Sequence, residues 1–249
     1  MEIEQQAAAA VAVAGLRKHY GKVEAVKGIS FEVKRGTTTA LLGGNGAGKT
    51  TTLSMLLGVL APNAGSITVL GCDMRTQRYD VLPRMNFTSP YVDLPKRLTV
   101  RENLLVFGDL YGLRDAHGRI GELARQFDLV DLLNRPYGQL SAGQRTRVSV
   151  AKALLNEPEV LLLDEPTASL DPDIGDRVRT YLEDYQRASR CTMLLASHNM
   201  GEVERMCDDV IMLRAGVVVD QGAPDDLIAR YGRADMEEVF LHIARAADT

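Results

Sequence analysis

The pattern of apolar and polar positions divides the chain into a strand-rich opening third, a helical middle, and a closing part in which strands and helices alternate. Apolar and β-branched runs bounded by turn signals predict strands over residues 11–16, 23–33, 37–42, 65–71 and 85–88.

Helical spacing dominates between residues 99 and 134. Apolar side chains recur there at one helical face, at Val100, Leu104, Phe107 and Tyr111, and residues 120–133 continue the pattern. Thr99 can cap the first helix, with Glu102 as its capping-box partner. We expect this stretch to be a helical insertion between two halves of an α/β core. Further helices are predicted over residues 171–188, 224–231 and 235–244.

A continuous apolar run over residues 160–163 ends in two carboxylates, Asp164 and Glu165. A run that is apolar on both faces is typical of a central parallel strand covered by helices. Acids at the carboxyl end of such a strand lie where open α/β sheets bind their ligands. A second core strand is predicted over residues 192–197, ending at His198, and a hairpin over residues 210–220.

Residues 43–51 read Gly-Gly-Asn-Gly-Ala-Gly-Lys-Thr-Thr and fit the phosphate-loop pattern G-x-x-x-x-G-K-[ST]. A β-prone segment enters this loop, and residues 52–60 leave it with helical spacing. Glycines allow backbone N–H groups to wrap a polyphosphate, and the helix N-terminus favours the anion. Lys49 is placed to reach the β- and γ-phosphates, and the Thr50 hydroxyl to bind Mg²⁺. An ordinary glycine turn before a helix is the alternative, and the strand–loop–helix context favours nucleotide binding over it.

Composition narrows the class of protein. The 249 residues are 45% hydrophobic and 25% charged, which is ordinary for a globular chain, and a net charge of −4 with a pI near 5.6 argues against a nucleic-acid partner. The apolar stretch over residues 7–15 is too short to span a bilayer, so a cytoplasmic location is expected. Cys72, Cys191 and Cys207 are widely spaced and are expected to be buried, reduced thiols.

The order of these features resembles the nucleotide-binding subunit of ABC transporters. The resemblance covers nearly the whole chain, and its most specific parts are Leu140-Ser141-Ala142-Gly143-Gln144, Asp164-Glu165-Pro166-Thr167 and Ser169-Leu170-Asp171. It implies an α/β fold: a P-loop NTPase core with an N-terminal antiparallel β subdomain and an inserted α-helical subdomain. The expected ATP-binding domain covers residues 10–232, with the core at 10–95 and 157–232 and the helical subdomain at about 96–156. Residues 233–249 are expected to be a short helical tail.

The same resemblance assigns roles to individual residues. Asp164 is similar to the Walker-B acid that supports Mg²⁺ together with Thr50, Glu165 to the base that orients the attacking water, and His198 to the switch histidine at the γ-phosphate. Tyr20 is similar to the aromatic residue that stacks on adenine, although an exposed turn tyrosine is an equally good interpretation on local grounds. The phosphate cradle implied by the family pattern consists of Gly43, Gly44, Asn45, Gly46, Ala47, Gly48, Lys49, Thr50 and Thr51.

Ser141, Gly143 and Gln144 resemble the signature that binds the ATP of a second subunit through a helix N-terminus. This implies a two-fold homodimer with two ATP molecules at its interface. Ala142 stands where glycine is commonest in the family, a change expected to matter little at a negative φ.

One position departs from the family pattern. Members usually have a glutamine where the core meets the helical insertion, and an ungapped count puts Pro90 there. Proline has no side-chain oxygen for a metal and no N–H. Either Mg²⁺ is held mainly by Thr50, the ATP oxygens and waters oriented by Asp164, with Tyr91 as an anchor for a membrane subunit, or the neighbouring Ser89 hydroxyl fills the place.

The leading hypothesis is an ATP-hydrolysing motor subunit, with ATP and Mg²⁺ as cofactors, that drives separate membrane permease subunits from the inner face of the cell membrane. The short tail favours an exporter. A soluble ABC ATPase acting on a non-transport assembly is the alternative. A regulatory nucleotide-binding protein without turnover is disfavoured by Glu165 and His198.

Overall fold

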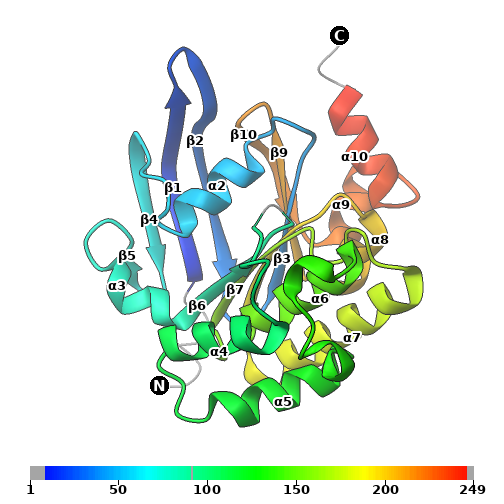
Figure 1. Ribbon diagram of the computed structural model, residues 1–249. Coiled ribbons are helices and arrows are strands. Elements are labelled where there is room, and N and C mark those ends of the chain that lie inside the picture. Colours follow the sequence, from blue (N-terminus) through cyan, green and yellow to red (C-terminus); the bar gives the residue numbers. More distant parts are fainter. Residues whose placement is uncertain (1–8, 91, 246–249) are drawn as a thin grey trace.

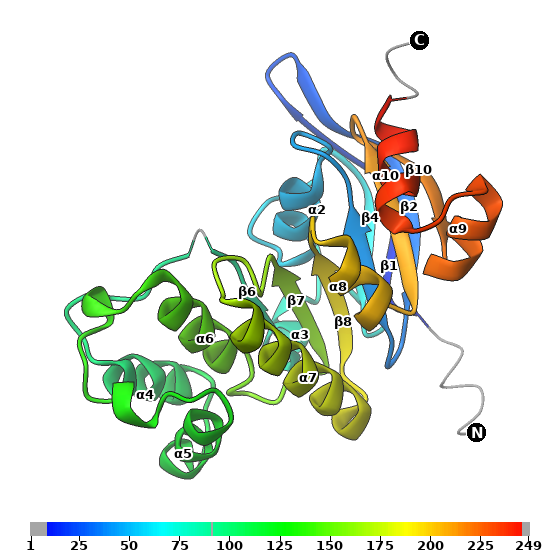
Figure 2. The ribbon, with the colours of Figure 1, turned by 90° about the vertical axis from the view of Figure 1, so that its right-hand side faces the viewer.

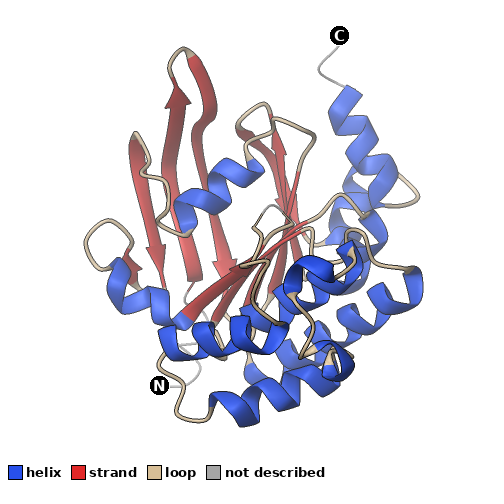
Figure 3. Cartoon of the chain, viewed as in Figure 1, coloured by secondary structure: helices blue, strands red, loops and turns tan. Residues whose placement is uncertain are grey.

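The computed structural model describes residues 9–90 and 92–245, which form two β-sheets with helices packed around and beside them (Figure 1, Figure 3). One sheet is four-stranded and antiparallel, in the order β2-β1-β4-β5, and the other is six-stranded, in the order β10-β9-β3-β8-β7-β6. The strands of the first sheet are β1 (Ala9–Tyr20), β2 (Val23–Lys34), β4 (Ala64–Val69) and β5 (Cys72–Asp73).

The second sheet holds the predicted core strands. Its members are β3 (Thr38–Leu42), β6 (Met85–Thr88), β7 (Val160–Asp164), β8 (Thr192–Ala196), β9 (Asp209–Arg214) and β10 (Val217–Gly222). The strands from β9 to β6 run parallel, and β10 turns back antiparallel to β9 as the predicted hairpin. The predicted α/β class, with an antiparallel sheet, a parallel sheet and inserted helices, is confirmed.

The helices follow the apolar periodicity closely. They are α2 (Lys49–Leu56), α3 (Arg78–Val81), α4 (Val100–Leu110), α5 (Ala116–Gln126), α6 (Ala142–Ala153), α7 (Pro172–Ser189), α8 (Met200–Met206), α9 (Pro224–Tyr231) and α10 (Met236–Arg245), with short 3₁₀ turns at Leu82–Arg84, Val130–Leu132 and Tyr137–Gln139.

The parallel sheet is buried on both faces, as the apolar run predicts. Along β7, Leu161 and Leu163 belong to a core shared with the helices, whereas Val160 and Leu162 belong to a core between the two sheets. Helix α2 contributes Leu53 to this second core. Successive side chains point to opposite faces of a strand, so each apolar strand contributes to both cores. This division fixes the register of the strands and how deeply the sheet is buried.

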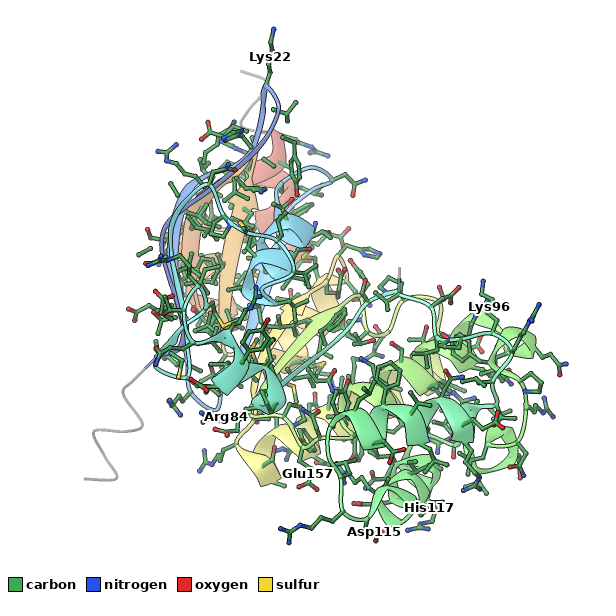
Figure 4. The ribbon with its side chains drawn as sticks, turned by 60° about the vertical axis from the view of Figure 1, so that its left-hand side comes forward. Lys22, Arg84, Lys96, Asp115, His117 and Glu157 are labelled. Atoms are coloured by element: carbon green, nitrogen blue, oxygen red, sulfur yellow. The ribbon has the colours of Figure 1, made fainter. Side chains whose placement is uncertain are left out.

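Helices α4, α5 and α6 form a lobe beside the sheets (Figure 2). The Thr99–Glu102 capping box is present at the start of α4, as predicted. Figure 4 shows Lys96, Asp115 and His117 on this lobe, far from Lys22 at the tip of the β1–β2 hairpin.

Three expected elements differ in extent. The helix expected to continue through residue 133 stops at Gln126, because Asp128 has a φ of 51° that a helix cannot contain. The helix after the phosphate loop begins earlier, at Lys49, and ends at Leu56, before Gly58 with its φ of 67°. Strand β1 continues to Tyr20, so this residue ends a strand instead of lying in a turn. The short helices α3 and α8 were not predicted.

Cys191 and Cys207 are buried free thiols and Cys72 is a half-buried one. Burial raises the pKa of Cys191 to about 12 and also raises the pKa of Cys207. Among the described helices, none combines the length and apolar character that a membrane crossing requires.

Candidate functional site

The carboxyl ends of four neighbouring parallel strands meet at one edge of the six-stranded sheet. The phosphate loop follows β3, His198 comes shortly after β8, Glu165 follows β7, and Ser89 follows β6. In the register of these strands Asp164 is paired with Ala196, and Thr88 with Leu163. Segments far apart in sequence therefore converge at this edge, where open α/β sheets bind ligands.

Close packing shapes the phosphate loop. A Cβ on Gly43 would lie 2.5 Å from the Leu213 carbonyl oxygen and 2.7 Å from the Ala47 Cβ. Gly48 precedes α2 with a φ of 103°, and a Cβ there would lie 2.8 Å from the Ala25 carbonyl oxygen. Both positions therefore need glycine for the fold itself. A Cβ on Gly44, in contrast, would meet nothing within 4 Å, so this part of the loop is open to an approaching group.

Lys49 folds back over this loop. Its ammonium donates hydrogen bonds to the carbonyl oxygens of Gly43 and Gly44, the second at 3.3 Å. Burial lowers the pKa of Lys49, and the negative charges of Glu165 and Asp164 oppose that shift. The cation thus lies within the electrostatic field of both acids, at the N-terminus of α2.

Asp164, at the end of β7, is 9% exposed and accepts a hydrogen bond of 3.1 Å at Oδ2 from the Ser89 hydroxyl. Burial raises the pKa of Asp164, whereas the Ser89 bond and the charge of Lys49 act in the opposite direction. Thr50, Ser89 and Asp164 line one cavity of about 220 Å³. Hydroxyl and carboxylate oxygens are the ligands that Mg²⁺ prefers, so this donor set fits the ion.

Glu165 and His198 are in direct contact. Nδ1 of His198 lies 2.7 Å from Oε1 of Glu165, with the Glu165 side chain 19% exposed and the imidazole 76% exposed. Glu165 has a φ of 51°, which is costly for a residue with a Cβ, and its N–H donates to the Ala196 carbonyl oxygen at 2.8 Å. The strained backbone and this bond hold the carboxylate at the mouth of the site.

A buried carboxylate joins the loops that carry these two residues. Glu202, in α8 and 2% exposed, accepts hydrogen bonds from the Thr167 hydroxyl at 2.9 Å and from the Ser197 hydroxyl at 2.5 Å. Thr167 lies two residues after Glu165, and Ser197 directly precedes His198. Sequence reasoning missed this network, because helix α8, which carries Glu202, was not predicted.

The signature residues form the start of α6. The Ser141 hydroxyl accepts from the Gln144 N–H at 3.2 Å, and the Gln144 side chain accepts from the Ser141 N–H at 3.0 Å, which makes a capping box. A Cβ on Gly143 would lie 3.1 Å from the Ser169 carbonyl oxygen. Ala142 is the first residue of α6, a conformation that suits alanine. Within the described residues, none of the hydrogen bonds of Ser141 or Gln144 reaches the phosphate loop of the same chain.

Tyr20 is 51% exposed at the end of β1, with the Lys18 ammonium 5.6 Å from its ring centre. The hairpin that carries it continues into β2, where the Ala25 carbonyl oxygen abuts Gly48. The ring is thus exposed on a hairpin that contacts the phosphate loop. Pro90 is exposed next to Ser89, and Tyr91, the expected anchor, lies outside the described residues.

Comparison with known proteins agrees with this geometry. Residues 26–168 match the model of the ABC transporter family. The chain is 40% identical over 236 residues to the Nod factor export ATP-binding protein I of Ralstonia nicotianae, covering 92% of this chain and 72% of that protein. It is 37% identical to the ABC transporter ATP-binding protein NatA of Bacillus subtilis, covering 88% and 90% of the two chains. A solved structure of an ATP-binding subunit of an ABC transporter superposes with a TM-score of 0.86 at 28% identity, covering 93% and 98% of the two chains.

The chain therefore belongs to the ABC transporter family, as an ATP-binding subunit. It carries the ATPase domain with which members of this family power transport. Subunits of this kind dimerise and work with membrane permease subunits. The open face at Gly44 and the cation at Lys49 fit the phosphates of ATP.

Proposed function

We propose that this chain hydrolyses ATP at two sites, each shared between two copies of the chain, and that closing and reopening of this homodimer drives separate permease subunits in export. The observation that carries the proposal is the contact of 2.7 Å between His198 and Glu165, beside the phosphate loop. The direction of transport is supported by the name of the relative that serves Nod factor export.

The residues of one chain have distinct tasks in this reaction. The loop from Gly43 to Thr51 holds the phosphates, Lys49 leaves its loop carbonyls to bind the β- and γ-phosphates, and Tyr20 stacks on adenine. Thr50 and Asp164 would hold Mg²⁺, which would supply positive charge beside the phosphate oxygens. The Ser89 hydroxyl orients Asp164, so Ser89 rather than Pro90 takes the place of the usual glutamine.

Glu165 acts as the general base. It accepts the proton of the attacking water while the water oxygen bonds to the γ-phosphorus and the bond to the ADP oxygen breaks. With its proton on Nδ1, His198 donates to Glu165 and fixes the direction of the carboxylate. The exposed edge of the imidazole is then available to the γ-phosphate.

The partner subunit completes each site. The N-terminus of α6 presents Ser141, Gly143 and Gln144, of which Ser141 is exposed and Gly143 and Gln144 are half-buried. We assign residues 10–232 to the ATP-binding domain, with the helical unit at about 96–156, and residues 233–249 to a tail. The permease subunits hold the dimer at the cytoplasmic face of the membrane.

Glu165→Gln tests the proposal. We expect this variant to bind ATP with near-normal affinity, to hydrolyse it at least about a hundredfold more slowly, and to elute as a dimer only when ATP is present. Lys49→Ala in the same background is the control, because it removes a phosphate contact and should abolish the ATP-dependent dimer. Hydrolysis at the wild-type rate by Glu165→Gln would contradict the role of Glu165.

A further inference from the structure

A buried lysine outside the site described so far joins the helical lobe to the parallel sheet. Lys152, near the end of α6, is 6% exposed. Its ammonium donates hydrogen bonds to the Asn86 side-chain oxygen at 3.1 Å and to the Phe87 carbonyl oxygen at 2.9 Å, both in β6. The rings of Phe87 and Phe107 lie 5.0 and 5.4 Å from it.

Other polar side chains extend this attachment along β6. The hydroxyls of Thr88 and Ser149 are 2.6 Å apart, and the Asn86 amide donates to the Asn156 side chain at 2.7 Å. Asn156 in turn donates to the carbonyl oxygens of Pro83 and Met85 at 2.9 and 3.1 Å. We call this set the α6–β6 clamp: Asn86, Thr88, Ser149, Lys152 and Asn156.

The two elements joined by the clamp serve the two different ATP sites of the proposed dimer: the signature at the start of α6 faces the ATP of the partner subunit, and β6 leads to the metal side of the chain's own site. Helix α6 begins directly after Ser141, and β6 leads into Ser89, which donates to Asp164. A helix of the length of α6 spans about 18 Å, so a tilt of roughly 10° about Lys152 moves Ser141 by about 3 Å. Misplacement of about 1 Å is enough to slow an enzyme severely. A fixed clamp therefore keeps the signature, which serves the partner's ATP, in a constant position relative to the metal side of the chain's own site.

The chemistry of Lys152 suits a geometric role. Its described partners are neutral: an amide oxygen, a carbonyl oxygen and two aromatic rings, with the hydroxyl of Tyr111 also on Asn86 at 3.4 Å. Burial alone lowers the pKa of Lys152 to about 8, with no carboxylate contributing a shift. A buried cation without a carboxylate is costly, but its donors fix directions in space that an apolar side chain cannot fix.

We propose that Lys152 is a positioning residue for ATP hydrolysis, which locks α6 to β6 so that the signature at Ser141 and the Ser89–Asp164 pair move as one unit. This inference rests on the proposed shared ATP site. It predicts that loss of the clamp weakens closure and turnover while leaving nucleotide binding to a single chain unchanged.

Lys152→Met tests the proposal, with Arg147→Met as the matched control. Arg147 is also a buried cation of α6, but it donates to the carbonyl oxygens of Phe127 and Asp128 at 2.8 and 2.9 Å, inside the helical lobe. For Lys152→Met we expect single-chain affinity for a fluorescent ATP analogue within about twofold of wild type and a kcat lower by at least about tenfold. For Arg147→Met we expect reduced thermal stability with kcat within about twofold.

Two further variants keep the test decisive. Lys152→Arg should retain most of the kcat, because the guanidinium can donate to the same two oxygens, and Ser149→Ala should show the same selective loss of kcat at about threefold. In the Glu165→Gln background, Lys152→Met should raise the ATP concentration needed for dimerisation. If Glu165→Gln alone fails to dimerise with ATP, the shared site is overturned. The positioning role of Lys152 is still decided by the kcat of Lys152→Met and of Arg147→Met, each relative to wild type.

Two results would overturn the positioning role. One is a kcat loss in Lys152→Met no larger than that in Arg147→Met at equal thermal destabilisation. The other is a parallel fall of single-chain nucleotide affinity and kcat. Should Lys152→Met fail to fold, Ser149→Ala decides the question through the same comparison of affinity and kcat.

Discussion

Nδ1 of His198 lies 2.7 Å from Oε1 of Glu165, although the two residues are separated by helix α7 and strand β8. The loops that carry them are joined through Glu202, which accepts from Thr167 and Ser197. Glu165, the proposed base, and His198, the residue proposed to orient it, are therefore parts of one connected unit.

The proposal that His198 acts through Glu165 predicts that the effects of their substitutions are not additive. We expect His198→Ala to lower kcat by about 10² and Glu165→Gln by about 10³, with the double variant no slower than Glu165→Gln alone. Steady-state ATPase kinetics of the three variants measure this coupling. Independent, multiplying effects would show that His198 acts on another group.

Ser89 should affect the requirement for Mg²⁺. Removal of its hydroxyl takes a hydrogen bond from Asp164 and allows the pKa of that carboxyl to rise further, so protons compete better with the metal. We expect Ser89→Ala to raise the half-saturating Mg²⁺ concentration by about three- to tenfold, both in ATP-analogue binding and in turnover. Pro90→Ala is the control and should leave both Mg²⁺ titrations in place. A shift in Pro90→Ala alone would reverse the assignment.

Alanine substitutions at two neighbouring glycines of the phosphate loop should have different effects, one on stability and the other on ATP affinity. In Gly43→Ala the new methyl group would lie 2.5 Å from the Leu213 carbonyl oxygen, so we expect a loss of about 2 kcal/mol in the free energy of unfolding. In Gly44→Ala the methyl group meets nothing within 4 Å, so stability should be kept while ATP affinity falls by about tenfold. Denaturant unfolding and nucleotide titration separate the two effects. Equal destabilisation of both variants would contradict this account of the loop.

The buried Lys152 predicts a stability change in alkaline solution. Its folded-state pKa of about 8 lies below the ordinary value of 10.5, so between these pH values the unfolded chain binds a proton that the folded chain does not. From this group alone, the free energy of unfolding therefore rises across that window, by up to about 3 kcal/mol. Lys152→Arg stays charged throughout and should lack the rise. Unfolding curves of both proteins between pH 7 and 10 test this through their difference, and parallel profiles would contradict it.

Much of the fold follows from local signals in the sequence. The continuous apolar run over residues 160–163, the helical spacing from Val100 to Tyr111, and the Thr99–Glu102 cap each depend on residues near one another in the chain. The Asp128 turn that ends the α5 segment early did not follow, because a positive φ at an aspartate leaves no periodic signal. The order of strands in the sheet is set by pairing between distant segments.

The sequence predicted which residues belong to the candidate site better than it predicted the contacts between them. The motifs indicated Lys49, Asp164, Glu165 and His198, but not that Lys49 folds onto Gly43 or that His198 contacts Glu165. A count along the sequence could not decide between Pro90 and Ser89, because the choice depends on the register between β6 and β7. Lys152 and Glu202 were missed because the sequence alone does not distinguish a buried charged residue from an exposed one; the packing around the residue does.

The most direct test of the central claim, that each ATP site is shared between two chains, mixes two inactive variants. Ser141→Arg disrupts the signature, and Lys49→Ala removes the lysine of the phosphate loop. A mixed dimer then contains one complete site, formed by the phosphate loop of the first variant and the signature of the second. We predict that each variant alone is inactive and that an equimolar mixture regains up to roughly a quarter of the wild-type ATPase rate, since half of random dimers are mixed. Mixing Ser141→Arg with the double variant Lys49→Ala/Ser141→Arg should restore nothing. A mixture of the two single variants as inactive as its components would contradict the shared site.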